Sequence, residues 1–342
     1  MQSVERTLKA LSKIYLTRHT LNMTKNIDKP SSLKTALIAI RPFALPASTM
    51  PVIFGTAASV LIGGARFDLP LFILTLFAMI ILHSGANLLS DVNDFKKGLD
   101  RVPTPVSGAI VRGYITPENG IIGSIVLFII GIGLGAVIVY RVGIPILIIG
   151  IIGIVIGASY TLKPLSLKYR ALGDLAVFLN FGTLGALGAW TVQTGQLSWV
   201  PALWAVPMSM LVVAILHANN WRDIVGDRSS HIRTLASILG DRGSCIYYGF
   251  LVFGSFGVIA LLILLTRLFG VFKPGMPLTF LITFLPFPLA LKLMARGIRR
   301  RLPEGKQGFV TLDATTSLLN LLFGLLCTCA LFLHQIIERY LQ

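Results

Sequence analysis

The stretch from Asn87 to Asp100 reads Asn-Leu-Leu-Ser-Asp-Val-Asn-Asp-Phe-Lys-Lys-Gly-Leu-Asp, and it ends a long apolar segment. Asn87, Asp91 and Asp94 are spaced i, i+4 and i+7, so a continuing helix places them on one face. Asp100 follows Gly98, on the loop that we expect after this helix. An ionised carboxylate at membrane depth costs several kcal/mol unless it is paired or binds a cation. The cluster therefore predicts a site for a hard divalent ion.

A second copy of this pattern ends another apolar segment and reads Asn-Asn-Trp-Arg-Asp-Ile-Val-Gly-Asp from Asn219 to Asp227. Asn219, Asp223 and Asp227 again share one face of a helix. The chain has 14 Asp and Glu, and these two stretches hold five of them: Asp91, Asp94, Asp100, Asp223 and Asp227. Residues needed only for solubility would be scattered, so the concentration indicates one site built from two parts.

Composition places the chain among membrane proteins. Of 342 residues, 54% are hydrophobic and only 13% are charged, which excludes an ordinary soluble domain. A net charge of +16 would suit nucleic acid, but the basic residues alternate with apolar spans and report on membrane topology instead. The three cysteines lie in apolar segments without the spacing of zinc ligands. We therefore expect contact with membrane lipid and no nucleic-acid partner.

Nine apolar segments are long enough to cross a bilayer. They cover about 36–63, 70–93, 118–139, 144–162, 171–192, 199–221, 243–266, 275–295 and 312–337. The expected fold is an all-α polytopic membrane protein, with about nine transmembrane helices around a central cavity. Residues 1–33 are expected to form a cytosolic N-terminal tail, with a mitochondrial presequence as the alternative, and residues 34–342 the transmembrane domain. Because the two acidic motifs lie four segments apart, helices 1–4 and 5–8 form two parallel repeats in this hypothesis.

The basic residues set the expected orientation. With a cytoplasmic N-terminus, only five of the 30 Lys and Arg fall on the outer side: Arg66, Arg141, Arg267, Lys273 and Arg339. This asymmetry follows the positive-inside rule. Both acidic motifs then lie at the cytoplasmic ends of their helices.

Carboxylates from two helix ends suit Mg²⁺, which prefers oxygen ligands and usually shares them with substrate phosphates. Basic side chains near the motifs would neutralise a departing diphosphate; they are Lys96, Lys97, Arg101, Arg112, Lys163, Lys168, Arg222 and Arg228. A polar site above apolar helices fits a lipid diphosphate whose tail lies among those helices. Ionising an allylic diphosphate produces a carbocation that water would capture, so the reaction needs a dry pocket.

At these residues the chain resembles the UbiA superfamily of membrane prenyltransferases, over nearly everything after residue 34. It is most similar to the branch that prenylates 1,4-dihydroxy-2-naphthoate in menaquinone synthesis. The resemblance rests on Ile40-Arg41-Pro42 with Leu45-Pro46, Asp94-Phe-Lys-Lys-Gly-Leu-Asp100, Ser107-Gly-Ala-Ile-Val-Arg-Gly113, Leu172-Gly-Asp174, Gln193-Thr-Gly195, and Asn219-Asn-Trp-Arg-Asp223 through Asp227 to Thr234-Leu-Ala236.

The resemblance implies roles for single residues. Asp91, Asp94 and Asp100 would bind one edge of a Mg²⁺-diphosphate, and Asp223 and Asp227 the other. The implied catalytic residues are Asp91, Asp94, Asp223 and Asp227. Asn87, Asn219 and Asn220 would support these acids, and Tyr160 with either Lys163 or Lys168 would correspond to the family's Tyr and Lys. Asp100 is also expected to contact the substrate, and among the basic residues near the motifs Arg112 and Arg222 are the foremost candidates for this contact. One departure is Ser90, where the family usually has Asn before the first Asp.

The implied reaction is metal-assisted loss of diphosphate from a polyprenyl donor, attack by an aromatic ring carbon, and loss of a proton or, in the naphthoate branch, of CO₂. The general base is not assigned, because His217 and His83 are each more readily explained as structural residues.

The wider gap from Asp94 to Asp100 favours the naphthoate branch over acceptors such as 4-hydroxybenzoate, homogentisate, haem or a chlorophyllide. A membrane transporter is the alternative function from another class. A phosphatidyl-type transferase is disfavoured, because this sequence does not contain the Asp-Gly-x-x-Ala-Arg pattern of those enzymes. The branch implies a bacterial inner (plasma) membrane.

Overall fold

The computed structural model describes residues 30–99, 103, 108–271, 273–301 and 305–341. Within these ranges helices dominate and no strand forms; the β-bridge between Arg170 and Arg233 is isolated. The expected all-α class is thus confirmed. Most of the expected N-terminal tail, residues 1–29, lies outside the described residues, as do Asp100 and Arg101.

The helices follow one another in this order: α2 (Ser32–Ile40), η1 (Pro42–Ala44), α3 (Pro46–Leu61), α4 (Leu69–Lys96), α5 (Pro117–Val142), α6 (Ile144–Thr161), η2 (Leu167–Tyr169), α7 (Gly173–Val177), η3 (Phe178–Thr183), α8 (Leu184–Thr194), α9 (Trp199–Trp204), α10 (Val206–Arg222), α11 (Ile224–Ser229), α12 (Leu235–Phe269), η4 (Leu278–Phe284), α13 (Phe287–Ile298), η5 (Arg299–Arg301), α14 (Gly305–Val310) and α15 (Leu312–Leu341).

Several of these helices are long and apolar enough to cross a membrane. Six do so in one piece: α4, α5, α6, the continuous run α7–η3–α8, α12 and α15. Two bent pairs raise the number of candidate spans to at most eight if each pair is one span. In one pair α2 and η1 meet α3 at a bend of 60°, and in the other η4 meets α13 at a bend of 41°. The chain is therefore a multi-pass membrane protein, but the described residues do not confirm the count of nine.

Prolines account for the divided segments. Pro46, Pro207 and Pro288 each stand in the first turn of a helix that follows a break. Proline lacks a backbone N–H and fits this position without losing a hydrogen bond. The expected span at 199–221 consequently forms two helices, α9 and α10.

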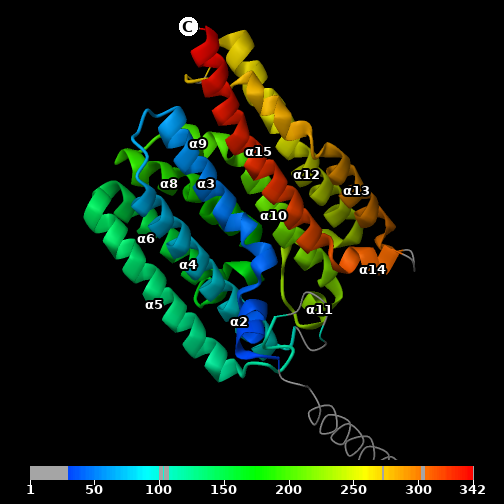
Figure 1. Ribbon diagram of the computed structural model, residues 1–342. Coiled ribbons are helices and arrows are strands. Elements are labelled where there is room, and N and C mark those ends of the chain that lie inside the picture. The colour runs from blue at the N-terminus through cyan, green and yellow to red at the C-terminus, as the bar shows by residue number, and fades with distance from the viewer. Residues whose placement is uncertain (1–29, 100–102, 104–107, 272, 302–304, 342) are drawn as a thin grey trace, which may run out of the picture.

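The helices pack side by side into a bundle (Figure 1), with α5 at one flank and α13 at the opposite one. The largest core cluster joins α3, α10, α12, η4 and α15 through large, fully buried side chains such as Phe54, Phe256, Phe280 and Phe323. In the first half α4 packs chiefly on α5, and in the second half α10 packs on α12. The pairs α4–α5 and α10–α12 occupy equivalent places in the hypothesis of two parallel repeats. The repeat itself stays a prediction.

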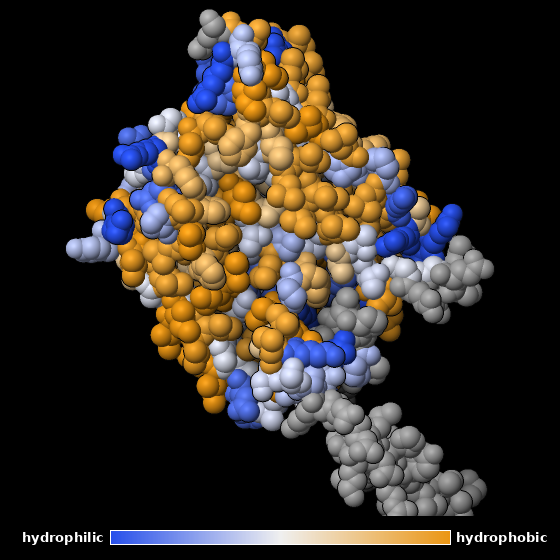
Figure 2. All heavy atoms as spheres, in the orientation of Figure 1, coloured by the Kyte–Doolittle hydropathy of each residue, from blue (hydrophilic) through white to orange (hydrophobic). Residues whose placement is uncertain are grey.

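The outer faces of the bundle are apolar. Figure 2 shows hydrophobic side chains over most of the visible flank. Few residues of α5 and α6 are buried against the rest of the protein. Because such surfaces are unfavourable in water, they are suited to lipid.

Candidate active site

Helix α4 continues unbroken to Lys96 and carries Asn87, Asp91 and Asp94 along one face. Both carboxylates are buried, Asp91 with 1% and Asp94 with 7% of its surface exposed. The Asn87 amide lies 3.5 Å from the carbonyl oxygen of Ile40 and faces the cavity described below. The spacing read from the sequence therefore corresponds to one face in the structure.

Asp91 is enclosed by two segments that are distant in sequence. Arg41, at the bend between α2 and η1, places its Nη2 2.6 Å from Asp91 Oδ1. Gly108 lies so close on the other side that a Cβ at this position would stand 1.6 Å from Asp91 Oδ2. The segment that carries Arg112 thus closes over Asp91 because its residue 108 has no side chain.

Asp94 is held by η2. Lys168 Nζ lies 2.6 Å from Asp94 Oδ2 and 2.9 Å from Ser90 Oγ, and the Tyr169 hydroxyl donates to Asp94 Oδ1 at 3.1 Å. Of the two candidate lysines, Lys168 is therefore the one that contacts the first motif. Lys163 is exposed. Tyr160, the third candidate on this side, lines the cavity.

These contacts fix the charges around Asp94. Burial alone would lower the pKa of Lys168, but the adjacent Asp94 outweighs it and the pKa lies above its ordinary value. Burial and the charge of Asp94 together raise the pKa of Tyr169. At neutral pH Lys168 therefore stays charged and Tyr169 stays protonated, so both donate to the carboxylate.

The second motif does not lie on one unbroken helix. Helix α10 ends at Arg222, Asp223 forms the junction, and α11 begins at Ile224. Arg222 bridges the junction: its Nε and Nη2 lie 3.2 Å from the two oxygens of Asp223, and Nη2 also contacts Asn219 Oδ1. The side chain of Asp223 stays 37% exposed.

Asp227 is buried at the end of the second motif and accepts a hydrogen bond of 2.8 Å from Thr234 Oγ1. Burial raises its pKa to about 6, with Asp223 and Asp94 adding to the rise, while the Thr234 hydrogen bond and Lys168 oppose it. The charges of Asp94 and Lys168, which belong to the other half of the chain, thus influence the pKa of Asp227. The fold brings the two acidic motifs into one electrostatic cluster.

Asp313, at the start of α15, was not among the candidates predicted from the sequence. This buried carboxylate accepts from Arg222 Nη1 at 2.9 Å and lines the cavity. The sequence did contain a signal for Asp313, because it is an acidic residue at the start of an apolar segment. Arg41, Tyr169 and Thr234 were also not among the candidates, although the quoted motifs include Arg41 and Thr234.

Three other candidates, Asn220, Arg228 and His217, do not line the cavity, whereas His83 does. Asn220 is buried, and Arg228 donates from Nε and Nη2 to the carbonyl of Ser237, which ties α11 to α12. His217 does not line the cavity; its Nδ1 lies 3.5 Å from Asp174 Oδ2 and its ring packs edge-on against Tyr247. His83 lies deeper in the cavity, with Nδ1 2.8 Å from Ser48 Oγ. Neither imidazole is placed beside the acidic cluster.

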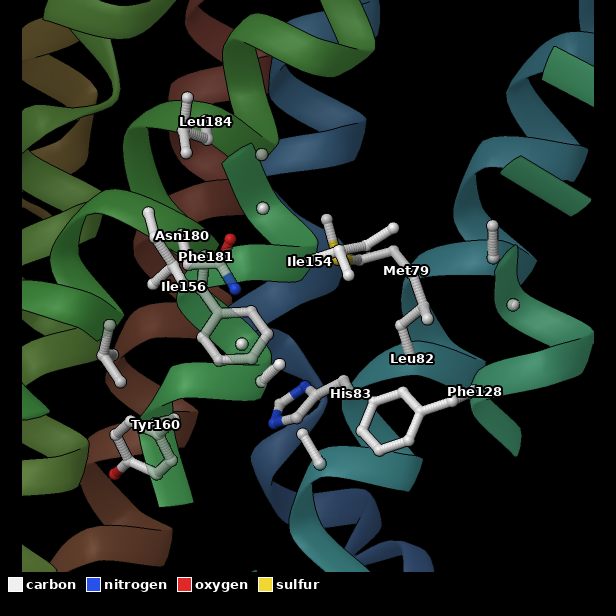
Figure 3. A pocket seen from close by; sticks show the side chains of 18 of the residues that line it. Met79, Leu82, His83, Phe128, Ile154, Ile156, Tyr160, Asn180, Phe181 and Leu184 are labelled. Atoms are coloured by element: carbon white, nitrogen blue, oxygen red, sulfur yellow. The ribbon is translucent and has the colours of Figure 1, made fainter. Parts of the chain in front are cut away.

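A cavity of about 880 Å³ extends from this cluster into the bundle. Its polar end is lined by Arg41, Asn87, Ser90, Lys168, Asn219 and Asp313, and its body by apolar side chains of α4, α5, α6, η3 and α8. Figure 3 shows Met79, Leu82 and Phe128 on one side of the pocket, and Ile156 and Phe181 on the other. The arrangement suits a ligand with an anionic head and a long apolar tail.

The donor set fits a hard cation that arrives with a phosphate ligand. Among the described residues, no three acidic, His or Cys side chains are grouped closely enough to form a ready metal site. Asp94 is paired with Lys168, and Asp223 with Arg222. Mg²⁺ commonly takes only one or two carboxylates and completes its shell with water and phosphate oxygens. Asp91, Asp94, Asp223 and Asp227 supply only oxygen ligands, as this ion prefers.

Comparison with known proteins agrees with this arrangement. The model of the UbiA prenyltransferase family matches residues 49–310. The UbiA prenyltransferase domain-containing protein 1 of Xenopus tropicalis is 32% identical over 88% of this chain and 84% of its own length. The 1,4-dihydroxy-2-naphthoate octaprenyltransferase of Bacillus subtilis is 28% identical over 86% and 90%.

The fold has a counterpart among solved structures. A UbiA homologue from Archaeoglobus fulgidus, solved with GPP and Mg²⁺, superposes with a TM-score of 0.59 at 14% identity, over 86% of this chain and 99% of the other. The expectation of a prenyl-transferring enzyme is confirmed at the level of the family. From the extent of these matches, the chain belongs to the UbiA prenyltransferase family.

Proposed function

We propose that the protein transfers a polyprenyl group from an allylic diphosphate to an aromatic acceptor, with Mg²⁺ as the metal and 1,4-dihydroxy-2-naphthoate as the acceptor. The observation that carries the proposal is the junction of two environments. Arg41, Lys168 and Asp313 line the polar end of an apolar cavity of about 880 Å³. Each of them is paired with a residue of the charged cluster behind it: Arg41 with Asp91, Lys168 with Asp94, and Asp313 with Arg222. A charged head and an isoprenoid tail need both.

The cationic side chains bind and orient the diphosphate. Lys168 and Arg222 are each paired with a carboxylate, and a Mg²⁺-diphosphate would take over those partners, since the ion satisfies the carboxylates and the phosphates satisfy the cations. Asp91 and Asp94 would hold the metal on one side, with Asp223 and Asp227 on the other. When bound, Mg²⁺ supplies neutralisation of the charge that develops on the leaving phosphate oxygens.

The bond between C1 of the donor and the bridging oxygen then breaks, and its electron pair leaves with the diphosphate. Lys168 and Arg222 stabilise that charge, and the apolar walls exclude water from the allylic cation. An electron-rich ring carbon of the acceptor attacks C1. In the naphthoate the ionised carboxylate at that carbon leaves as CO₂, and the electron pair of the broken carbon–carbon bond restores the aromatic ring.

Two observations support the naphthoate as acceptor: the Bacillus subtilis relative is named for it, and the gap from Asp94 to Asp100 suits the same branch. Prenylation of 4-hydroxybenzoate is the second candidate within the same chemistry. A transporter is disfavoured, because its acidic residues are expected near the bilayer midplane, whereas here they cluster with cations at one end of the bundle. The cytoplasmic position of that end, and a bacterial plasma membrane, remain part of the proposal.

The test uses membranes that contain the full chain, Mg²⁺, a long-chain allylic diphosphate and either acceptor, with the product followed by mass. We expect prenylated naphthoquinol with loss of CO₂. Asp91→Ala and Asp223→Ala should each lower the rate by about 10²-fold or more. Glu118→Gln, which alters an exposed carboxylate of α5, is the matched control and should keep the rate. Product from 4-hydroxybenzoate alone would show that the benzoate, and not the naphthoate, is the acceptor. Full activity of both Asp variants would contradict the assignment of the metal site.

A further inference from the structure

Two polar side chains stand in the apolar body of the cavity. They are His83 of α4 and Asn180 of η3, and both line the cavity wall. Figure 3 shows them among apolar side chains such as Met79 and Phe128. Only 5% of the surface of His83 is exposed. The reaction steps proposed above use neither residue, so their place in an apolar wall needs another explanation.

The hydrogen bonds around His83 leave one ring nitrogen for a ligand. Nδ1 lies 2.8 Å from Ser48 Oγ, and the Ser48 hydroxyl itself donates to the Leu45 carbonyl at 3.1 Å. Because a hydroxyl has only one proton to donate, the proton between His83 and Ser48 belongs to Nδ1. In this neutral tautomer Nε2 is a hydrogen-bond acceptor. Among the described residues Nε2 has no partner.

The Asn180 amide offers further hydrogen-bonding groups. The π-helical turn η3 carries Asn180 and its neighbour Phe181, and both line the cavity. The amide packs against Gly153 and Gly157 of α6, where a Cβ would stand 3.2 Å from Oδ1 and 3.7 Å from Nδ2. Within the part of the chain that the structure describes, neither amide atom has a hydrogen bond. Single π-helical turns inside helices are frequent at functional sites.

An isoprenoid tail cannot satisfy these groups, because it contains neither a donor nor an acceptor. A tail that displaced water from them would leave them unpaired in apolar surroundings, which is unfavourable. A hydroxylated aromatic ring fits better. Its hydroxyl can donate to His83 Nε2, and the Asn180 amide can bond a second polar substituent. The rings of Phe181, 4.5 Å from that of His83, and of Phe128 provide aromatic contacts for it.

The position of His83 along α4 agrees with such a ring. His83 precedes Asp91 by eight residues, which is about 12 Å along the helix axis. The diphosphate of the proposed function lies beside Asp91, and the attacked carbon C1 follows directly after it. The remaining length suits one or two fused rings. A ring held at His83 therefore has a carbon within reach of C1.

We propose that His83 and Asn180 form the subsite of the aromatic acceptor, in which His83 Nε2 accepts a hydrogen bond from a ring hydroxyl. This inference rests on the proposed function and names the residues that select its acceptor. The ligand class is a hydroxylated aromatic ring, to which both the naphthoate and 4-hydroxybenzoate belong. The hydrogen bond also raises the electron density of the ring, which favours its attack on the allylic cation.

The test compares the wild-type protein with His83→Phe and Asn180→Leu in lipid nanodiscs, without oxygen, using 1,4-dihydroxy-2-naphthoate, or 4-hydroxybenzoate if only that is prenylated. We expect KM for the acceptor to rise about tenfold or more, while KM for the donor changes less than about threefold. His83→Gln keeps an acceptor oxygen and should bring KM back to within about threefold. Thr75→Val is the matched control, because Thr75 lines the same cavity but its hydroxyl already donates to the Leu71 carbonyl at 2.7 Å.

Equilibrium binding, measured with Mg²⁺ and inorganic pyrophosphate in place of the donor, gives a readout that needs no turnover. The ligands are the naphthoate and two analogues that each lack one hydroxyl, 1-hydroxy-2-naphthoate and 4-hydroxy-2-naphthoate. One analogue should bind the wild-type protein about tenfold more weakly than the parent compound, and this difference should disappear in His83→Phe.

An unchanged acceptor KM in both His83→Phe and Asn180→Leu would overturn the subsite and show that water alone satisfies the two groups. The same would follow if Thr75→Val raised this KM equally, or if the analogues showed the same differences in His83→Phe as in the wild-type protein. Melting temperatures in detergent identify the variants that fold, and Asn180→Leu carries the test if His83→Phe does not. Failure of the wild-type protein to prenylate either acceptor would contradict the proposed function, whereas binding of the hydroxylated ring that is lost in His83→Phe would still support the subsite.

Discussion

Gly108 shows how a residue without a side chain sets the site. A Cβ there would overlap Asp91 Oδ2 at 1.6 Å, so Gly108→Ala must move either the carboxylate or the segment above it. A misplacement of about 1 Å at a reacting centre costs about 10²-fold in rate. We expect kcat to fall by about that factor, measured in the prenylation assay.

The matched control is Gly133→Ala, because a Cβ at Gly133 meets nothing within 4 Å. This variant should keep the parent rate. If Gly108→Ala were equally active, the contact between this segment and Asp91 would have no role in positioning the carboxylate.

Asp227 makes the cluster sensitive to pH. Its pKa lies at about 6, above the ordinary 3.8, chiefly because the carboxyl group is buried. The folded protein then binds this proton more tightly than the unfolded chain, so without metal the free energy of unfolding falls as the pH rises through about 4 to 6. A cation must displace the proton, so its affinity falls as the pH drops below about 6.

We expect the Mg²⁺ concentration for half-maximal stabilisation to rise several-fold, up to about tenfold, between pH 7 and pH 5, measured by thermal unfolding in detergent. Asp227→Asn should weaken Mg²⁺ binding at pH 7 and lose most of this pH dependence. A wild-type midpoint that stays constant over the same range would show that Asp227 does not compete for the ion.

Helix α12 is interrupted by a kink at Gly240. Gly240 has φ 66° and ψ −173° inside the helix, a conformation that only glycine adopts without a cost of about 1–3 kcal/mol. The turn before it carries Thr234, which bonds to Asp227, and Ser237, whose carbonyl accepts from Arg228. The break thus lets α12 begin beside the second motif and then follow the bundle.

Gly240→Ala should lower the free energy of unfolding by about 1–3 kcal/mol and weaken Mg²⁺ binding through Asp227. Gly257→Ala is the matched change in the same helix, because a Cβ at that position meets nothing and its backbone is helical. It should leave the melting temperature equal or slightly higher. Equal melting temperatures for both variants would show that the chain accommodates an alanine at the break.

The helices also show how far the sequence predicts the site. The i, i+4, i+7 spacing predicted the face of α4 that carries Asp91 and Asp94, because that helix continues through the motif. The same pattern did not predict the break at Asp223, where Arg222 turns toward Asp313 on α15. Local periodicity carries no information about such a partner. Likewise, apolar length predicted multiple spans, whereas prolines near the helix starts decided which segments divide.

In the whole molecule, the site joins elements that are remote in sequence. Asp94 on α4 is held by η2, and Arg222 on α10 by α15. Each half supplies carboxylates and at least one cation, and the cavity lies between the halves. The sequence indicated this duplication, but the pairing of each acid with a particular base depends on the packing of the bundle. Because the acidic cluster and its cations lie at one end of the bundle, the orientation in the membrane decides which side supplies the substrates.

The distribution of basic residues predicts that this end faces the cytoplasm. Arg66 follows α3 and Lys96 ends α4, so the two exposed side chains lie at opposite ends of one span. In a chain whose Cys245, Cys327 and Cys329 are replaced by alanine, Arg66→Cys should react with an impermeant maleimide added to intact cells. Lys96→Cys should react only after the cells are opened, because the positive-inside rule keeps basic loops on the cytoplasmic side. Labelling of Lys96→Cys alone in intact cells would reverse the orientation and place the diphosphate site on the outer face, where the donor would have to be supplied from outside the cell.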